Sequence, residues 1–126
     1  MKDFKGKIMI ADDEPFNVDL TTIHLTWMWV KRENIIVATD WIEAVQKAMT
    51  NNIALIFMDV IMPGGGWIKA AETIKSHYKE KSPIIIAKTA YAHPIEWIAV
   101  MDHVIITPIN KDNFEKILKD VLNRQS

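Results

Sequence analysis

Short apolar segments alternate with longer amphipathic segments along the whole chain, and this alternation restricts the fold more than any other feature. The apolar segments are rich in Ile, Val and Met, which is typical of strands buried on both faces of a parallel sheet. We expect strands at 7–11, 34–38, 53–58, 84–88 and 103–106, and helices at 15–29, 41–51, 67–79, 94–101 and 111–123. Repeated βα units of this kind predict an α/β fold, a doubly wound parallel sheet in a three-layer α/β/α sandwich.

Length and composition are those of one globular domain. No linker or internal repeat divides the 126 residues, so we expect a single domain over 1–126. The net charge of −1 gives no reason to expect direct binding to nucleic acid or to a membrane. The absence of cysteine excludes disulfides and thiolate metal sites. Because the N-terminus lacks a signal-peptide core and no apolar run reaches 18 residues, we expect a cytoplasmic protein.

Three acidic residues lie where two of the expected strands end. Asp12 and Asp13 follow the first strand, and Asp59 follows the third. In an open parallel sheet, ligands bind outside the carboxyl ends of the strands where the strand order reverses. Gathered carboxylates repel one another unless a cation joins them, and oxygen ligands suit magnesium. The alternative reading is that these residues are solvated loop acids or helix caps.

Four short motifs follow one another in an order that resembles the receiver domains of response regulators. They are Asp12-Asp13-Glu14-Pro15, Met58-Asp59-Val60-Ile61-Met62-Pro63, Thr89-Ala90-Tyr91-Ala92 and Thr107-Pro108-Ile109. The resemblance covers the chain from about residue 5 to residue 123 and is closest to the receivers of hybrid sensor histidine kinases. It implies a flavodoxin-like sheet of five parallel strands in the order 2-1-3-4-5.

The resemblance also implies a chemistry for the acidic residues. Asp59 would accept a phosphoryl group from a histidine-phosphate on a partner kinase. Mg²⁺ would be held by Asp13 and Asp59, with Asp12 acting mainly through water and the backbone carbonyl of Ile61 completing the ligands. The hydroxyl of Thr89 would donate a hydrogen bond to a phosphoryl oxygen and act as a switch.

The sequence departs from the family at one catalytic position. The family has a lysine immediately before the proline that follows the fifth strand, and this chain has Thr107 there. Lys88 and Lys111 are the nearest lysines in sequence. Strand alternation directs Lys88 away from the side of the sheet that carries Thr89, and Lys111 falls in the next helix. We therefore expect neither lysine to replace the missing one.

Other departures fall at positions that the family uses for switching or for tight turns. Val104 stands where the family has its switch aromatic. Trp41 and Val100 replace glycines, and a third glycine position, before the second strand, lies near Trp29. Because glycines at such places often have positive φ, bulky residues there are expected to be strained.

We predict a phosphorelay receiver that works with a histidine kinase or a phosphotransfer protein and requires Mg²⁺. It would assist its own phosphorylation and dephosphorylation without being a stand-alone enzyme. A homodimer or a downstream protein would use the face from the helix at 94–101 to the strand at 103–106. Two alternatives stay open: a pseudo-receiver interaction module with lost or uncoupled phosphorylation, and a magnesium-dependent phosphatase or nucleotide-binding enzyme.

Overall fold

The structure is a computed structural model that describes residues 6–60, 66–89, 101–107 and 109–124. Five parallel strands form one sheet in the order β2-β1-β3-β4-β5, as the sequence predicts. The strands are β1 (Lys7–Ala11), β2 (Ile35–Ala38), β3 (Ile53–Asp59), β4 (Ile84–Thr89) and β5 (His103–Ile106). The α-helices are α1 (Pro15–Trp27), α2 (Trp41–Thr50), α3 (Trp67–Tyr78) and α5 (Lys111–Arg124), and two short 3₁₀ helices span Arg32–Asn34 and Lys79–Lys81.

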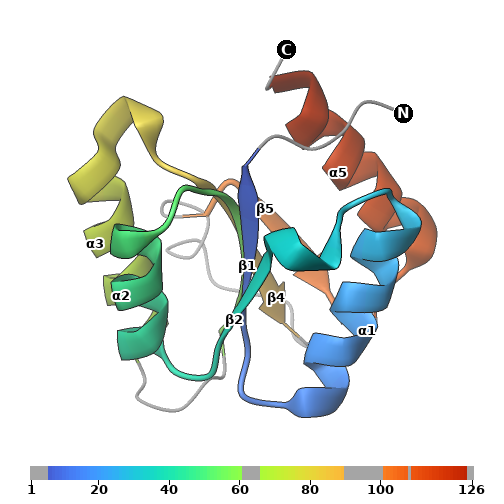
Figure 1. Cartoon of the computed structure of the whole chain (residues 1–126), viewed down its shortest axis with the longest axis horizontal. Helices are drawn as coiled ribbons and strands as arrows, with labels where there is room; N and C mark the ends of the chain where they lie inside the picture. Colours follow the sequence, from blue (N-terminus) through green and yellow to red (C-terminus); the bar gives the residue numbers. More distant parts are fainter. Residues whose placement is uncertain (1–5, 61–65, 90–100, 108, 125–126) are drawn as a thin grey trace.

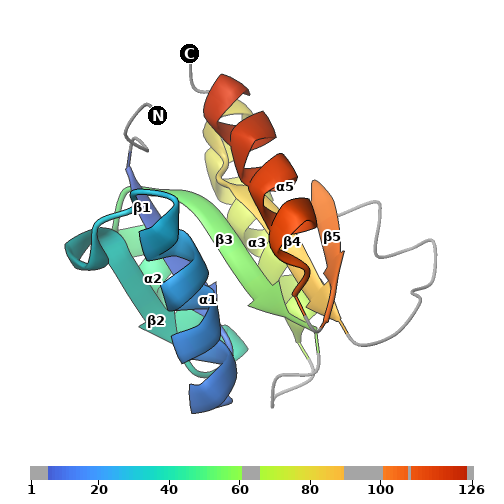
Figure 2. The ribbon, with the colours of Figure 1, turned by 90° about the vertical axis from the view of Figure 1, so that its right-hand side faces the viewer.

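Helices cover both faces of the sheet, so the strands are buried from both sides (Figure 1). Helices α1 and α5 lie on one face, and α2 and α3 lie on the other (Figure 2). On the α1/α5 face the core contains Ile8, Ile10, Leu55, Phe57, Ile86 and Ile105 from the strands. On the α2/α3 face it contains Met9, Ala11, Ile56, Met58, Ile85 and Ala87. Successive residues of each strand therefore alternate between two separate cores, as the pleat requires.

Helix α1 ends two residues earlier than the sequence predicts. The N–H groups of Trp29 and Val30 donate to the carbonyls of Thr26 and Leu25, both at 3.1 Å, which is the pattern of a Schellman motif. Trp29 occupies the position of this motif that usually holds glycine, and its φ is 70°. The sequence expectation of a bulky residue in a glycine-type conformation is thus confirmed near Trp29. At Trp41 it is wrong, because among the described residues only Trp29 and Lys79 are non-glycine residues with positive φ.

Helix α2 begins with a side-chain cap. The carboxylate of Asp40 accepts from the N–H of Glu43 at 2.8 Å, while the Glu43 carboxylate accepts from the N–H of Thr39 at 3.2 Å. Such reciprocal bonds satisfy N–H groups that a helix leaves unpaired at its start.

The predicted helix at 94–101 lies outside the described residues except for Met101, as do Ile61, Tyr91 and Val100. Within the described ranges, none of the helices combines the length and the apolar character needed to cross a membrane.

Candidate functional site

The strand register brings polar side chains together at the carboxyl end of the α1/α5 face. At the carboxyl end of each of four strands, the residue two positions after the last core residue of this face is polar. These residues are Asp12 after Ile10, Asp59 after Phe57, Lys88 after Ile86, and Thr107 after Ile105. Asp59 and Lys88 are direct partners in the β3–β4 ladder. Because residues two apart share a face of a strand, these four side chains lie over the same end of the sheet.

The three acidic residues converge as the strand ends suggest. Asp12, Asp13 and Asp59 each offer a carboxylate oxygen, and these oxygens lie within 4.8 Å of one another. Asp12 is buried, Asp59 is half-buried and Asp13 is exposed, so the cluster opens from the sheet toward solvent. The donor set is three hard carboxylate oxygens, which suits Mg²⁺ better than a soft metal. The residues present therefore fit the magnesium ion that the sequence predicts.

Asp12 is held from two sides by the protein itself. Its Oδ1 accepts from the N–H of Glu14 at 3.0 Å, which fixes the turn into α1. Its Oδ2 accepts from Nζ of Lys88 at 2.8 Å, and the two side chains are only 1% and 4% exposed. The Asp12 carboxylate is thus a buried, hydrogen-bonded group rather than a solvated loop acid.

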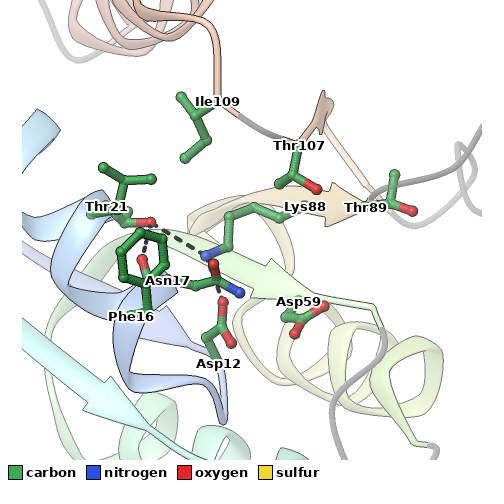
Figure 3. Close-up of a pocket in the computed structure, with 10 residues that line it drawn as sticks. Asp12, Phe16, Asn17, Thr21, Asp59, Lys88, Thr89, Thr107 and Ile109 are labelled. Carbon is green, nitrogen blue, oxygen red and sulfur yellow. Dashed lines mark hydrogen bonds and ion pairs between the residues drawn. The ribbon is translucent and has the colours of Figure 1, made fainter.

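Lys88 reaches across the sheet from β4 to α1 (Figure 3). Besides the Asp12 contact, its Nζ lies 3.3 Å from Oγ1 of Thr21. The Thr21 hydroxyl donates to the carbonyl of Asn17 at 2.9 Å, so its oxygen is free to accept from the ammonium. Helix α1 therefore supplies a second oxygen partner for the ammonium.

Strand alternation does not exclude Lys88 from the site. Alternation does place Lys88 and Thr89 on opposite sides of β4, but the carboxylates of Asp12 and Asp59 lie on the side of Lys88. Lys111 behaves as expected: it opens α5, and its ammonium lies 5.9 Å from the centre of the Trp27 ring.

A cavity of about 250 Å³ separates α1 from the loop after β5 and reaches these side chains (Figure 3). Its lining combines Asp12, Asn17, Thr21, Asp59, Lys88, Thr89 and Thr107 with the apolar residues Phe16, Leu20 and Ile109. Liquid water occupies about 30 Å³ per molecule, so the cavity is roomy enough for a phosphoryl group and several waters. Phe16 is 69% exposed and stands at its edge on α1.

The two threonines of the motifs meet at the ends of the last two strands. Thr89 is the final residue of β4 and is buried, and its carbonyl accepts from the N–H of Thr107 at 2.7 Å. Although Thr89 faces the α2/α3 side, it also lines the cavity because the strand ends there. The structure thus gathers Asp12, Asp59, Thr89 and Thr107 around one space.

Two of the departures from the family pattern have a packing explanation. The ring of Trp41 lies against Gly66, where an added Cβ would come within 2.7 Å of Trp41 Cε2. The glycine thus makes room for the tryptophan at the start of α3. Val104 is half-buried and packs against the core of the α2/α3 face.

Comparison with known proteins assigns the fold and the family. The model of the response regulator receiver domain family matches residues 8–123.

The chain belongs to the response regulator receiver domain family.

Individual relatives agree with this assignment. The receiver is 30% identical over 125 residues to the transcriptional regulatory protein ResD of Bacillus subtilis; the match covers 95% of this chain and 49% of ResD. The chain thus spans about half the length of this curated relative. The chain is also 27% identical in sequence to the response regulator TrrA of Thermotoga maritima, whose structure was solved in complex with Mg²⁺-BeF. The two structures match with a TM-score of 0.81 over 93% of this chain and 99% of TrrA.

A further neighbour is the receiver domain of Ssk1 from Saccharomyces cerevisiae, solved with the histidine phosphotransfer protein Ypd1. Its TM-score is 0.82 at 21% identity, with coverage of 96% of this chain and 91% of that one, so it supports the fold. The finer resemblance to receivers of hybrid kinases stays a prediction.

Five residues of α1 and β4 that line the cavity were not expected at the site from the sequence: Phe16, Asn17, Leu20, Thr21 and Lys88. A signal was present for Lys88, because it directly follows four apolar residues of β4, and a lysine that is buried there must be paired. The helix residues carried no comparable signal.

Proposed function

We propose that this receiver accepts a phosphoryl group on Asp59 from a phosphohistidine of a partner protein. A carboxylate oxygen of Asp59 forms the new O–P bond while the P–N bond to the imidazole breaks. The electron pair of that bond returns to the imidazole nitrogen, and the product is an aspartyl phosphate. The convergence of Asp12, Asp13 and Asp59 at one end of the sheet is the observation that carries the proposal.

The residues of this chain have separable tasks in that reaction. Asp13 and Asp59 would hold Mg²⁺, with Asp12 acting through water and the carbonyl of Ile61 added by analogy with the family. When bound, the ion offsets the negative charge that the transferred group brings. Thr89 lines the cavity, and its hydroxyl would donate to a phosphoryl oxygen. Positioning and charge are the main demands of phosphoryl transfer.

The partner would dock on α1 beside the cavity. Phe16, Ile23 and Trp27 are 69%, 37% and 62% exposed, and their spacing of seven and four residues places them along one face of the helix. Phe16 lines the same cavity as Asp59, so the apolar face of α1 is continuous with the proposed reaction site. We propose a histidine kinase or phosphotransfer protein as this partner, as in the Ssk1–Ypd1 complex.

The receiver would be a signalling protein of the cytosol rather than a stand-alone enzyme. It would assist its own phosphorylation and the hydrolysis of the aspartyl phosphate. It would transmit the signal through a conformational change that alters its surface. An additional contact surface from the helix at 94–101 to β5 stays a prediction, since residues 94–100 lie outside the described ranges.

One experiment tests the proposal against its two rivals. The protein is incubated with acetyl phosphate and Mg²⁺, and its intact mass is measured. We expect a phosphoryl adduct that requires Mg²⁺ and is absent from Asp59→Asn. Absence of the adduct together with absence of Mg²⁺ binding would favour the pseudo-receiver, whose supporting observation is Thr107. Turnover of a soluble phosphate ester with no covalent intermediate would favour the enzyme.

The docking surface has its own test. Trp27→Ala should slow transfer from a phosphotransfer protein by roughly tenfold, in keeping with the cost of removing an aromatic anchor. It should leave labelling by acetyl phosphate unchanged, since that small donor needs no docking. Trp29→Ala is the matched control because Trp29 is 69% exposed but lies beyond the end of α1.

A further inference from the structure

A buried lysine stands beside the reaction site of a receiver that lacks the family lysine. The ammonium of Lys88 is 2.8 Å from Asp12, and its side chain is 4% exposed. Burial of a charge is costly unless the charge is paired and hydrogen-bonded, and a hydrophobic residue at this strand position would avoid the cost. The presence of the pair inside an apolar strand therefore points to a task beyond packing.

The charges of the site support a catalytic task. Asp12, Asp13 and Asp59 bring three negative charges, and Lys88 brings one positive charge, which leaves a net formal charge of −2. A divalent cation would bring that sum to zero. Without the lysine, the three carboxylates and the cation would together keep a charge of −1, which would repel an incoming phosphoryl anion. Lys88 thus supplies the single positive charge that the substitution at Thr107 removes.

The position of Lys88 agrees with that role. Lys88 pairs with Ile105 in the β4–β5 ladder, and Thr107 is two residues beyond Ile105 on the same face. Lys88 is also the direct ladder partner of Asp59. The lysine thus comes from the strand between the acceptor strand and the strand that usually supplies it, and it lines the same cavity as Asp59 and Thr107 (Figure 3).

We propose that Lys88 is the positioning cation of the phosphoryl site and replaces, from β4, the lysine that is absent at Thr107. This inference rests on the proposed phosphorylation of Asp59. Before modification the ammonium binds Asp12 and Thr21. An ammonium has three N–H donors, and within the described part of the chain these two residues take two of them. The third donates to an oxygen of the phosphoryl group on Asp59 and holds it in the cavity.

The test compares Mg²⁺ binding with beryllofluoride binding in Lys88→Met. Both affinities are measured by calorimetry on the whole protein, with beryllofluoride added at saturating Mg²⁺. We expect Mg²⁺ to bind at least about tenfold more tightly, because a repelling charge is gone. We expect beryllofluoride, a phosphoryl mimic, to bind at least about tenfold more weakly, because its anionic group loses a donor. A purely structural lysine would not move the two affinities in opposite directions.

Lys75→Met serves as the matched control. Lys75 also pairs with an aspartate, Asp102, at 2.9 Å, but this pair lies away from the cavity lining. Both affinities should stay within about twofold of the unmodified protein, since charges farther apart than a Debye length of roughly 8–10 Å are largely screened.

A second variant tests the replacement itself. Thr107→Lys added to Lys88→Met should restore the beryllofluoride affinity to within about threefold, since it returns one donor to the cavity. If Lys88→Met does not fold, Asp12→Asn is compared with Asp12→Asn/Lys88→Met. Neither variant contains an unpaired buried carboxylate at position 12, and the beryllofluoride affinity is measured in the same way.

The outcomes separate this inference from the proposed function. If the unmodified protein forms no Mg²⁺-dependent adduct on Asp59, the proposed function fails and this inference falls with it. If the adduct forms and beryllofluoride affinity is unchanged by loss of Lys88, the function stands and the role of Lys88 is overturned. Opposite shifts of the two affinities, together with rescue by Thr107→Lys, support the inference.

Discussion

Two lysine–aspartate pairs, one at each end of the sheet, have nearly the same geometry and very different surroundings. Lys88 and Asp12 meet at 2.8 Å at the carboxyl ends of the strands, with side chains 4% and 1% exposed. Lys75 and Asp102 meet at 2.9 Å near the start of β4 and β5, with side chains 29% and 27% exposed. From these distances alone, the two ion pairs would be expected to contribute equally to stability.

Burial makes the pairs unequal because it changes what happens when one partner is lost. In a low-dielectric interior, the remaining charge has no water to solvate it. Near the surface, water and salt replace the missing partner at little cost. The Lys88 pair therefore links stability to the acidic cluster, whereas the Lys75 pair links α3 to the segment that precedes β5.

The largest expected effect is the loss of stability in Lys88→Met. Removing the lysine leaves the Asp12 carboxylate buried and unpaired, so the free energy of unfolding should fall by about 3–5 kcal/mol. Urea denaturation without Mg²⁺ measures it, and added Mg²⁺ should return part of the loss. A decrease below about 1 kcal/mol would place this pair with the exposed ones.

Asp102→Ala should cost about 2 kcal/mol, which is more than a surface ion pair is worth. Oδ2 of Asp102 also accepts from the backbone N–H of Ile85 at 2.8 Å, and Ile85 is fully buried. A buried N–H without an acceptor costs roughly 1–3 kcal/mol. Asp102→Asn, which keeps an acceptor oxygen, is the control and should cost about half as much in the same denaturation experiment.

Lys75→Met should lower the free energy of unfolding by only about 0.5–1 kcal/mol, the usual worth of a partly exposed pair. The Ile85 hydrogen bond to Asp102 survives in this variant, so the backbone stays satisfied. Thermal unfolding at neutral pH is sensitive enough to measure the change. A loss comparable to that of Lys88→Met would show that burial does not govern the difference.

The smallest expected effect is the response of each pair to salt. A double-mutant cycle gives the coupling energy of Lys75 with Asp102, and it should fall by about 0.3 kcal/mol or more between 0.05 and 1 M NaCl. The coupling of Lys88 with Asp12 should change by less, since ions do not enter the space between them. Equal salt sensitivity would contradict the assignment of the two environments.

Much of the molecule could be predicted before its structure was known. The five strands and their order, the convergence of the acids and the conformation near Trp29 all follow from local signals or from the motif order. Apolar runs mark strands because a sheet covered on both faces leaves no room for polar alternation.

Lys88 shows what strand alternation cannot predict. Alternation gives the relative sides of neighbouring residues along one strand, but it does not say which side carries the site. That choice depends on the register between β1, β3 and β4, which places Asp12, Asp59 and Lys88 together. The apolar wall from Phe16 and Leu20 depends in the same way on how α1 packs.

The βα units and the acids at the strand ends can be recognised in the sequence alone, because hydrophobic period and residue type act over short distances. The pairing of Lys88 with Asp12 depends instead on how the whole chain folds. A buried ammonium takes its meaning from the carboxylate that faces it, and that carboxylate is 76 residues away along the chain.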